Sequence, residues 1–183
     1  NPESSAIFAE YPPILHDHSL LHLITDTVRL MVVSSSNLSP YAVEDVMTAS
    51  IKLHHTNELK AAEVWTAMEG AMPALGIVAC VLGVVKTMGA IDQPPPVLGA
   101  LIGSALVGTF MGVLLAYGLV GPFAIRLKQI IEEEGEMYKM VQQLIVANLH
   151  GHPMPLVIEA ARVCISHENQ PTFAEVFDGM RGK

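Results

Sequence analysis

Three side chains that could bind a metal ion recur along one predicted helix. His18, His22 and Asp26 are spaced four residues apart, so a helix would place them on one face. His54 and His55, further along the chain, could add ligands. The alternative, which we favour, is a polar face that is solvated or paired with a neighbouring helix. We therefore predict no metal and no cofactor.

Ion transport is a second chemistry to consider, and it concerns two long apolar segments. A path for protons or cations needs ionisable or strongly polar groups inside the membrane. The segments offer Lys86 and a few neutral groups, which are Thr87, Ser104, Thr109 and Tyr117, but no carboxylate. If the protein conducts ions, the titrating carboxylate must come from a partner.

Other chemistries find little support in the sequence. No G-x-x-x-x-G-K-[ST] motif is present, and no nucleophile–base pair stands out, so we predict that the chain is not an enzyme. The net charge of −8 argues against nucleic-acid binding. Cys80 and Cys164 cannot form a disulfide framework, and we expect small packing residues.

The elements that must carry these residues are predicted to be membrane helices. Only 15% of the residues are charged, and 51% are hydrophobic. Residues 70–85 and 93–125 contain no charge, and about 20 apolar residues suffice to span a bilayer. The prolines that follow Asp92 cannot continue a helix. We predict spans at 70–91 and 97–122, joined by a tight turn at 92–96.

Charges beside the spans predict their orientation. Lys60 precedes the first span, whereas Arg126 and Lys128 follow the second, and the turn carries only Asp92. Basic residues favour the cytoplasmic side. We therefore expect both ends of the chain in the cytoplasm and the turn outside.

The remaining parts are predicted to be helical, which makes the fold all-α: a two-helix transmembrane hairpin with helical cytoplasmic segments on both sides. The expected domains are 1–69, the hairpin at 70–125, and C-terminal helices at 126–183. A break is expected at residues 34–37, before a helix that starts at Ser39 and Pro40.

Two short motifs lie in the C-terminal part. Thr172 and Glu175 have the spacing of a capping box, which predicts a last short helix. The run from Glu132 to Glu134 indicates a solvated helix face, or alternatively a docking patch for a partner.

Small residues are frequent in the second span. Gly99 and Gly103, like Gly108 and Gly112, form small-xxx-small pairs that let membrane helices approach closely. Such pairs are explained by generic packing within the chain, or by an interface between copies of the protein.

Two prolines interrupt the spans. Pro73 and Pro122 each lie near the predicted cytoplasmic end of a span and remove a helical hydrogen bond. They are either inert membrane prolines or paired hinges that bend during a working cycle.

The two-span block is similar to a known family. GAMPALGIVACVLGVVKTMGAID from Gly70 and LGALIGSALVGTFMGVLLAYGLVGPFA from Leu98 resemble the last two spans of MotA-type flagellar stator subunits, in the MotA/TolQ/ExbB group. The opening NPESSAIFAEYPPIL, the segment MPLVIEAAR and the ending QPTFAE also resemble that family.

The resemblance implies an assembly with several components. It implies a four-span protein, so that two further spans and the start of the cytoplasmic domain are expected upstream of Asn1. Five such subunits would surround two copies of a MotB-type partner, whose membrane aspartate carries the ion. The rotor protein FliG would receive the torque.

The resemblance also implies roles for individual residues. Pro73 and Pro122 match the functional prolines of the family, and Thr109 matches the threonine that faces the ion site. Cys80 stands where sodium-driven relatives have threonine and proton-driven relatives usually have a small apolar residue, so it favours protons.

We therefore expect a proton-driven stator subunit in the bacterial inner membrane. One alternative is a TolQ/ExbB-type energiser of an outer-membrane system. The other is a membrane scaffold that conducts no ions.

Overall fold

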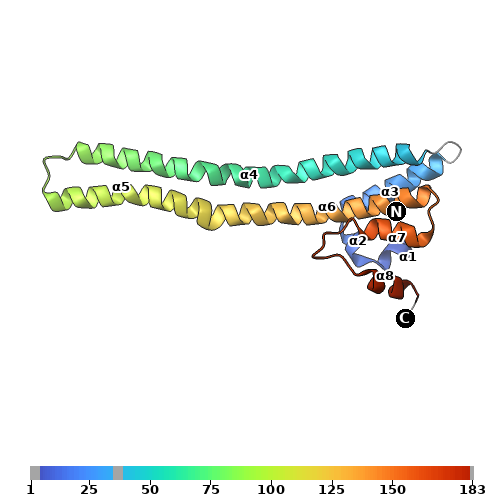
Figure 1. Cartoon of the computed structure of the whole chain (residues 1–183). Coiled ribbons are helices and arrows are strands. Elements are labelled where there is room, and N and C mark those ends of the chain that lie inside the picture. Colours follow the sequence, from blue (N-terminus) through green and yellow to red (C-terminus); the bar gives the residue numbers. More distant parts are fainter. Residues whose placement is uncertain (1–4, 35–38, 182–183) are drawn as a thin grey trace. The chain divides into compact units, whose positions relative to one another are not determined.

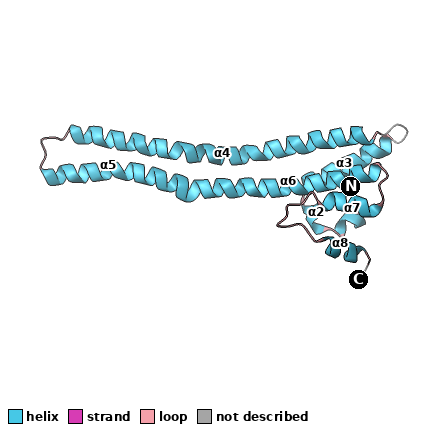
Figure 2. Ribbon diagram, viewed as in Figure 1, coloured by secondary structure: helices cyan, strands magenta, loops and turns pink. Residues whose placement is uncertain are grey.

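The computed structural model describes residues 5–34 and 39–181, and every regular element in that part of the chain is a helix (Figure 2). The predicted all-α fold is thus confirmed. The predicted break lies largely outside the described residues, although Ser34 is the C-cap that ends the helix before it. The helices are α1 (Ala6–Ala9), α2 (Pro12–His16), α3 (His18–Val33), α4 (Pro40–Met88), α5 (Pro95–Leu115), α6 (Gly121–Leu149), α7 (Met154–Arg162) and α8 (Phe173–Met180), with a π-helical turn, η2 (Ala116–Val120), between α5 and α6.

The chain divides into two compact units, which we describe separately. The first comprises Asn1–Thr56 and Glu132–Lys183, and the second comprises Asn57–Ile131. Helices α4 and α6 each run from one unit into the other. The helix predicted at Pro40 and the first predicted span are consequently one helix of 49 residues.

The second unit contains a helical hairpin. In Figure 1, α4 and α5 run antiparallel and are joined by a short turn. Helix α5 begins at Pro95, two residues before the predicted start of the second span. Proline fits there because the first N–H groups of a helix have no partner within it. The N–H of Val97 donates to the carbonyl of Pro94 at 2.9 Å and closes the first turn.

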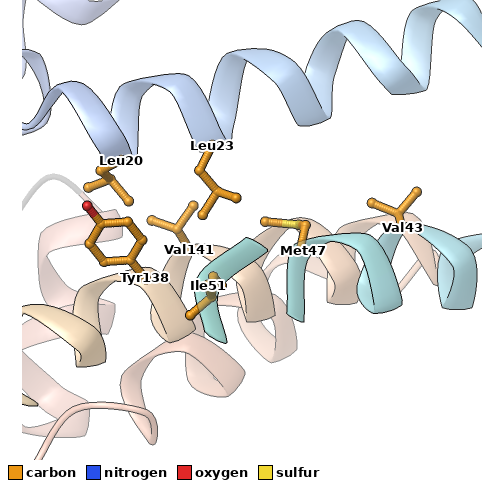
Figure 3. Packing of buried hydrophobic residues seen from close by; sticks show 7 residues of the cluster. All are labelled: Leu20, Leu23, Val43, Met47, Ile51, Tyr138 and Val141. Carbon is orange, nitrogen blue, oxygen red and sulfur yellow. The ribbon is translucent and has the colours of Figure 1, made fainter. Parts of the chain in front are cut away.

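A hydrophobic core holds the first unit together (Figure 3). It joins α3, α4 and α6 through Leu20, Leu23, Val43, Met47, Ile51, Tyr138 and Val141, all at most 9% exposed. The Tyr138 hydroxyl donates to both carboxylate oxygens of Asp17, at 3.0 and 3.1 Å. Asp17 also caps α3, because its side chain accepts from the N–H of Leu20. One carboxylate thus fixes both the start of α3 and its distance from α6.

The C-terminal segment is held by polar contacts of the short helices. The predicted capping box of α8 is confirmed: Glu175 donates its N–H to the Thr172 hydroxyl, and its carboxylate accepts from the N–H of Thr172. This backbone hydrogen bond lowers the pKa of Glu175. In α7, both carboxylate oxygens of Glu159 accept from Arg162, at 2.6 and 2.8 Å. Arg162 also donates to the carbonyl of Pro171.

The Glu159 contact predicts a pH dependence of stability. The hydrogen bond from Arg162 lowers the pKa of Glu159 in the fold. Its contribution to stability is therefore complete above the ordinary glutamate pKa and is lost as the pH falls through the lower value in the fold. Glu159→Gln should lower the melting temperature slightly at pH 7 and make it less sensitive to acid. The exposed Glu168 is the matched control, because Glu168→Gln should leave the acid sensitivity as in the wild type.

Candidate functional site

Close backbone contact between α4 and α5 defines the hairpin. A Cβ atom added at Gly76 would lie 2.8 Å from the carbonyl oxygen of Gly108 and 3.1 Å from the Cα of Gly112. At Gly112, it would lie 2.8 Å from the carbonyl oxygen of Met72. A Cβ at Gly83 would collide with Ala105. We refer to Gly76, Gly83, Gly108 and Gly112 as the glycine seam.

The two predicted glycine pairs occupy different surroundings. Gly108 and Gly112 belong to the glycine seam. A Cβ added at Gly99 or Gly103, by contrast, would meet no heavy atom within 4 Å. Their role in helix packing remains a prediction, and any such contact must be with a group outside this hairpin.

Thr109 and Cys80 lie along the same stretch of the hairpin. The Thr109 hydroxyl is 3.4 Å from the carbonyl oxygen of Gly76, to which it donates a long hydrogen bond across the seam. Both Thr109 and Cys80 are half-buried. The backbone nitrogen of Cys80 lies 3.5 Å from the Cβ position of Gly108, the neighbour of Thr109.

Other polar groups of the spans bond within their own helix. The Thr87 hydroxyl donates to the carbonyl of Gly83 at 2.9 Å, and the Ser104 hydroxyl donates to that of Leu101 at 2.8 Å. Lys86 is exposed in the last turn of α4, and Tyr117 is 61% exposed in η2. Thr109 thus differs from Thr87 and Ser104, because its hydroxyl bonds to the other helix of the hairpin.

The two prolines lie in different helical settings. Pro73 is half-buried inside the continuous α4, whereas Pro122 is exposed at the second position of α6. The π-helical turn η2 ends directly before α6, and its last bond joins the N–H of Gly121 to the carbonyl of Ala116. A π turn relieves the clash that a proline ring causes with the carbonyl of the preceding turn.

Sequence reasoning did not predict the π turn. Its signal would have been Pro122 at the end of an apolar run that contains Gly118 and Gly121, because these residues tolerate a widened turn. Such turns often mark functional positions in helices. Their occurrence beside Pro122 is consistent with a hinge, which remains a prediction.

The residues considered for a metal site are dispersed. His18, His22 and Asp26 are exposed on α3, and Asp26 pairs with Arg29 at 3.0 Å. The ring of His54 stacks on Tyr138, with centroids 4.8 Å apart. Within residues 5–34 and 39–181, no three His, Cys, Asp or Glu side chains are grouped to hold a metal ion.

The glutamate run and Cys164 lie outside the hairpin. Residues 132–134, the glutamate run, are exposed on α6. The Cys164 thiol is 3.3 Å from the carbonyl oxygen of Ala160, and burial raises its pKa. This environment disfavours the reactive thiolate.

Fold and site together define a helical membrane protein. In the described part of the chain, α4 and the continuous helix from Pro95 to Leu149 are long and apolar enough to cross a bilayer. Little of either apolar window is buried within the chain, as expected for helices that face lipid. The class is therefore a membrane protein built on a closely packed two-helix hairpin.

The chain belongs to the MotA/TolQ/ExbB proton channel family, whose sequence pattern matches residues 17–140. It is 38% identical over 181 residues to Motility protein A of Escherichia coli, which covers 99% of this chain and 61% of that protein. It is 32% identical over 175 residues to Chemotaxis protein LafT of Vibrio parahaemolyticus, with coverages of 96% and 61%. The chain thus spans about three fifths of the length of these relatives.

Solved structures share the fold. A structure of MotAB from C. jejuni aligns with a TM-score of 0.71 at 18% identity, over 93% of this chain and 65% of that one. The flagellar MotAB stator complex of Bacillus subtilis aligns with a TM-score of 0.68 at 21% identity, over 80% and 56%. At these identities the alignments establish the fold.

Proposed function

We propose that this chain is a subunit of a flagellar stator, in which proton flow through a complex with a MotB-type partner produces torque on the rotor. The observation that carries the proposal is the 38% identity to Motility protein A over 99% of the chain. The alignment includes the whole hairpin, with Pro73, Thr109 and Pro122.

The mechanism follows from what the hairpin contains and lacks. Residues 70–85 and 93–125 carry no carboxylate, so the MotB-type partner supplies the membrane aspartate that takes up the proton. Thr109 and Cys80 line the path beside it. Cys80 favours protons over sodium because thiols are weak ligands for hard cations.

The glycine seam and the prolines then convert proton movement into a change of shape. The seam keeps α4 and α5 rigidly together, whereas Pro73 and Pro122 act as hinges at which the helices bend. Five copies of the subunit turn around a pair of MotB-type partners, and the cytoplasmic part of each copy acts on the rotor protein FliG. Gly99 and Gly103 contact neighbouring helices of this assembly.

The proposed topology places both ends of the chain in the cytoplasm of a bacterial inner membrane. Lys60, Arg126 and Lys128 flank the hairpin on the inner side, and residues 92–96 form the external turn. The proposed domains are 1–69 and 126–183 in the cytoplasm and 70–125 in the membrane. The chain acts without a cofactor and is not an enzyme.

Two other functions fit the family. A TolQ/ExbB-type energiser would use the same hairpin to drive an outer-membrane system, and a scaffold would use it for packing alone. The stator is preferred because the motility relatives align along nearly the whole chain, including its helices outside the hairpin. A scaffold gives no reason for a proline-adjacent π turn.

Deletion of the full-length gene in the source organism tests the proposal. We expect cells with normal numbers of flagella that do not swim, and recovery of swimming when the full-length gene is restored. An energiser predicts the reverse pattern: normal swimming and a loss of outer-membrane uptake. Swimming and uptake that both stay normal, in a strain without a second copy of the gene, would favour the scaffold.

A further inference from the structure

We propose that Glu69 is a proton-binding site at the inner end of the hairpin, through which protons leave the conduction path. The inference rests on the proposed function and deepens it, because it assigns the transported ion to a named group of this chain. The sequence placed Glu69 one residue outside the first predicted span.

The Glu69 carboxyl group lies against the backbone at the start of α6. A Cβ added at Gly121 would be 2.8 Å from Oε1 of Glu69 and 3.1 Å from its Cδ. The same Cβ would be 3.2 Å from the carbonyl oxygen of Ala116. Glu69 is half-buried. Glycine at position 121 therefore leaves the space that the carboxyl group occupies between the two helices.

This position lies between the two proline-altered stretches of backbone. Pro73 has no N–H, so it cannot donate the α-helical bond that the carbonyl of Glu69 would accept. On the opposite helix, Gly121 closes the π turn by donating to Ala116, and Pro122 follows it directly. Glu69 thus brings a titratable side chain to the point where both helices depart from regular α-helical bonding.

Proton release needs an acceptor at this end of the hairpin. The uncharged segments 70–85 and 93–125 hold none, and Glu69 is the carboxylate that adjoins the first segment on the inner side. A proton leaving the path forms an O–H bond on Glu69 while the bond to its donor breaks. The neutral acid then gives the proton to water on the cytoplasmic side, which regenerates the carboxylate.

Binding of the proton also changes what Glu69 can bond to. The carboxylate only accepts hydrogen bonds, whereas the neutral acid donates one and can reach a backbone carbonyl. A backbone carbonyl lacks its α-helical donor where the residue four positions later is a proline. The carbonyl of Gly118 is such a group, because Pro122 has no N–H to donate to it. Loading and release of the proton therefore change the bonding options beside the π turn.

The charged neighbours leave the Glu69 carboxylate available. Within the described residues, no cation forms an ion pair with it. On α6, Arg126 has its guanidinium 3.5 Å from Oε1 of Gln129. Glu63 and Lys128 line a separate surface depression with Leu59 and Thr66. Trp65, four residues before Glu69, packs edge to face against Phe123, with the ring centroids 4.6 Å apart.

The test uses the full-length protein, expressed with its MotB-type partner in cells that lack both. Glu69→Gln should slow the rotation of tethered cells about tenfold, which is less than the roughly hundredfold or larger loss typical of a catalytic proton-transfer group. Wild-type rotation should slow as the cytoplasm is acidified with a weak acid, because a higher internal proton concentration opposes release of the proton to water. The Gln variant should lose most of this dependence on internal pH.

Two comparisons separate proton transfer from packing. The exposed Glu63 on the same helix is the matched control, and Glu63→Gln should rotate like the wild type at every internal pH. Gly121→Ala displaces the carboxylate, and it should slow rotation by itself but add little to Glu69→Gln. Membrane abundance and co-purification of the partner should stay normal in all variants.

Several outcomes would overturn the assignment. One is a Glu69→Gln variant that keeps wild-type speed and wild-type dependence on internal pH. Another is a double variant in which the slowing caused by Gly121→Ala adds fully to the slowing caused by Glu69→Gln. If the wild type rotates no cells, the proposed motor function fails, and proton flux into vesicles that hold the complex decides on Glu69. Equal proton flux through the wild-type complex and the Glu69→Gln complex would refute the proton site. The absence of flux through both complexes would refute it as well.

Discussion

Replacing Gly76 by alanine is expected to disrupt the hairpin and, in the proposed stator, to stop the motor. The added methyl group would lie 2.8 Å from the carbonyl oxygen of Gly108, and backbone atoms cannot move aside as a flexible side chain can. Overpacking of this kind costs about 1–3 kcal/mol. We expect a lower melting temperature of the purified complex in detergent and little or no rotation of tethered cells.

Gly70 provides the matched control for this prediction. It lies on the same helix, and an added Cβ meets nothing within 4 Å. Gly70→Ala should therefore be neutral or slightly stabilising, because alanine favours a helix over glycine by about 1 kcal/mol. Equal melting temperatures for the Gly76 and Gly70 variants would show that the glycine seam does not hold the helices together.

Replacing Pro122 by alanine is expected to leave flagella intact but turning weakly. Alanine restores an N–H that can bond to the carbonyl of Gly118, so the π turn can close into a regular α-helix. The proposed hinge then loses its weak point. We expect tethered cells to rotate roughly tenfold more slowly, as for a conformational step whose barrier rises by about 1.4 kcal/mol.

Pro96 is the matched control for the hinge. It is the second residue of α5, in the first turn, where no N–H is required for helical bonding. Pro96→Ala should leave rotation nearly unchanged. The hinge proposal fails if the Pro122 variant rotates at wild-type speed with wild-type protein levels, or if both proline variants are equally slow.

The hairpin was predictable because its signals are strong and local. Long uncharged segments mark the spans, and the prolines after Asp92 allow no continuous helix. The resemblance to the family was specific for the same block. The capping box at Thr172 was also predictable, because it depends on residues three positions apart.

Features that depend on which residues face each other were not predictable. Spacing alone makes Gly99 and Gly103 equivalent to Gly108 and Gly112, and only the second pair faces α4. On α3, Leu20 is fully buried whereas Val28 is 47% exposed, although both side chains are apolar. The proximity of Glu69 to Gly121 could not be read from the sequence, because these residues are 52 positions apart.

Rotation of single tethered cells during induction of the gene shows whether this chain generates torque from proton flow. The cells lack the endogenous gene, carry the MotB-type partner, and receive the full-length gene under an inducible promoter. We expect that rotation starts from rest, rises as the protein accumulates, and stops when a protonophore collapses the proton gradient. Rotation that does not depend on induction, or that persists without the proton gradient, would contradict this expectation.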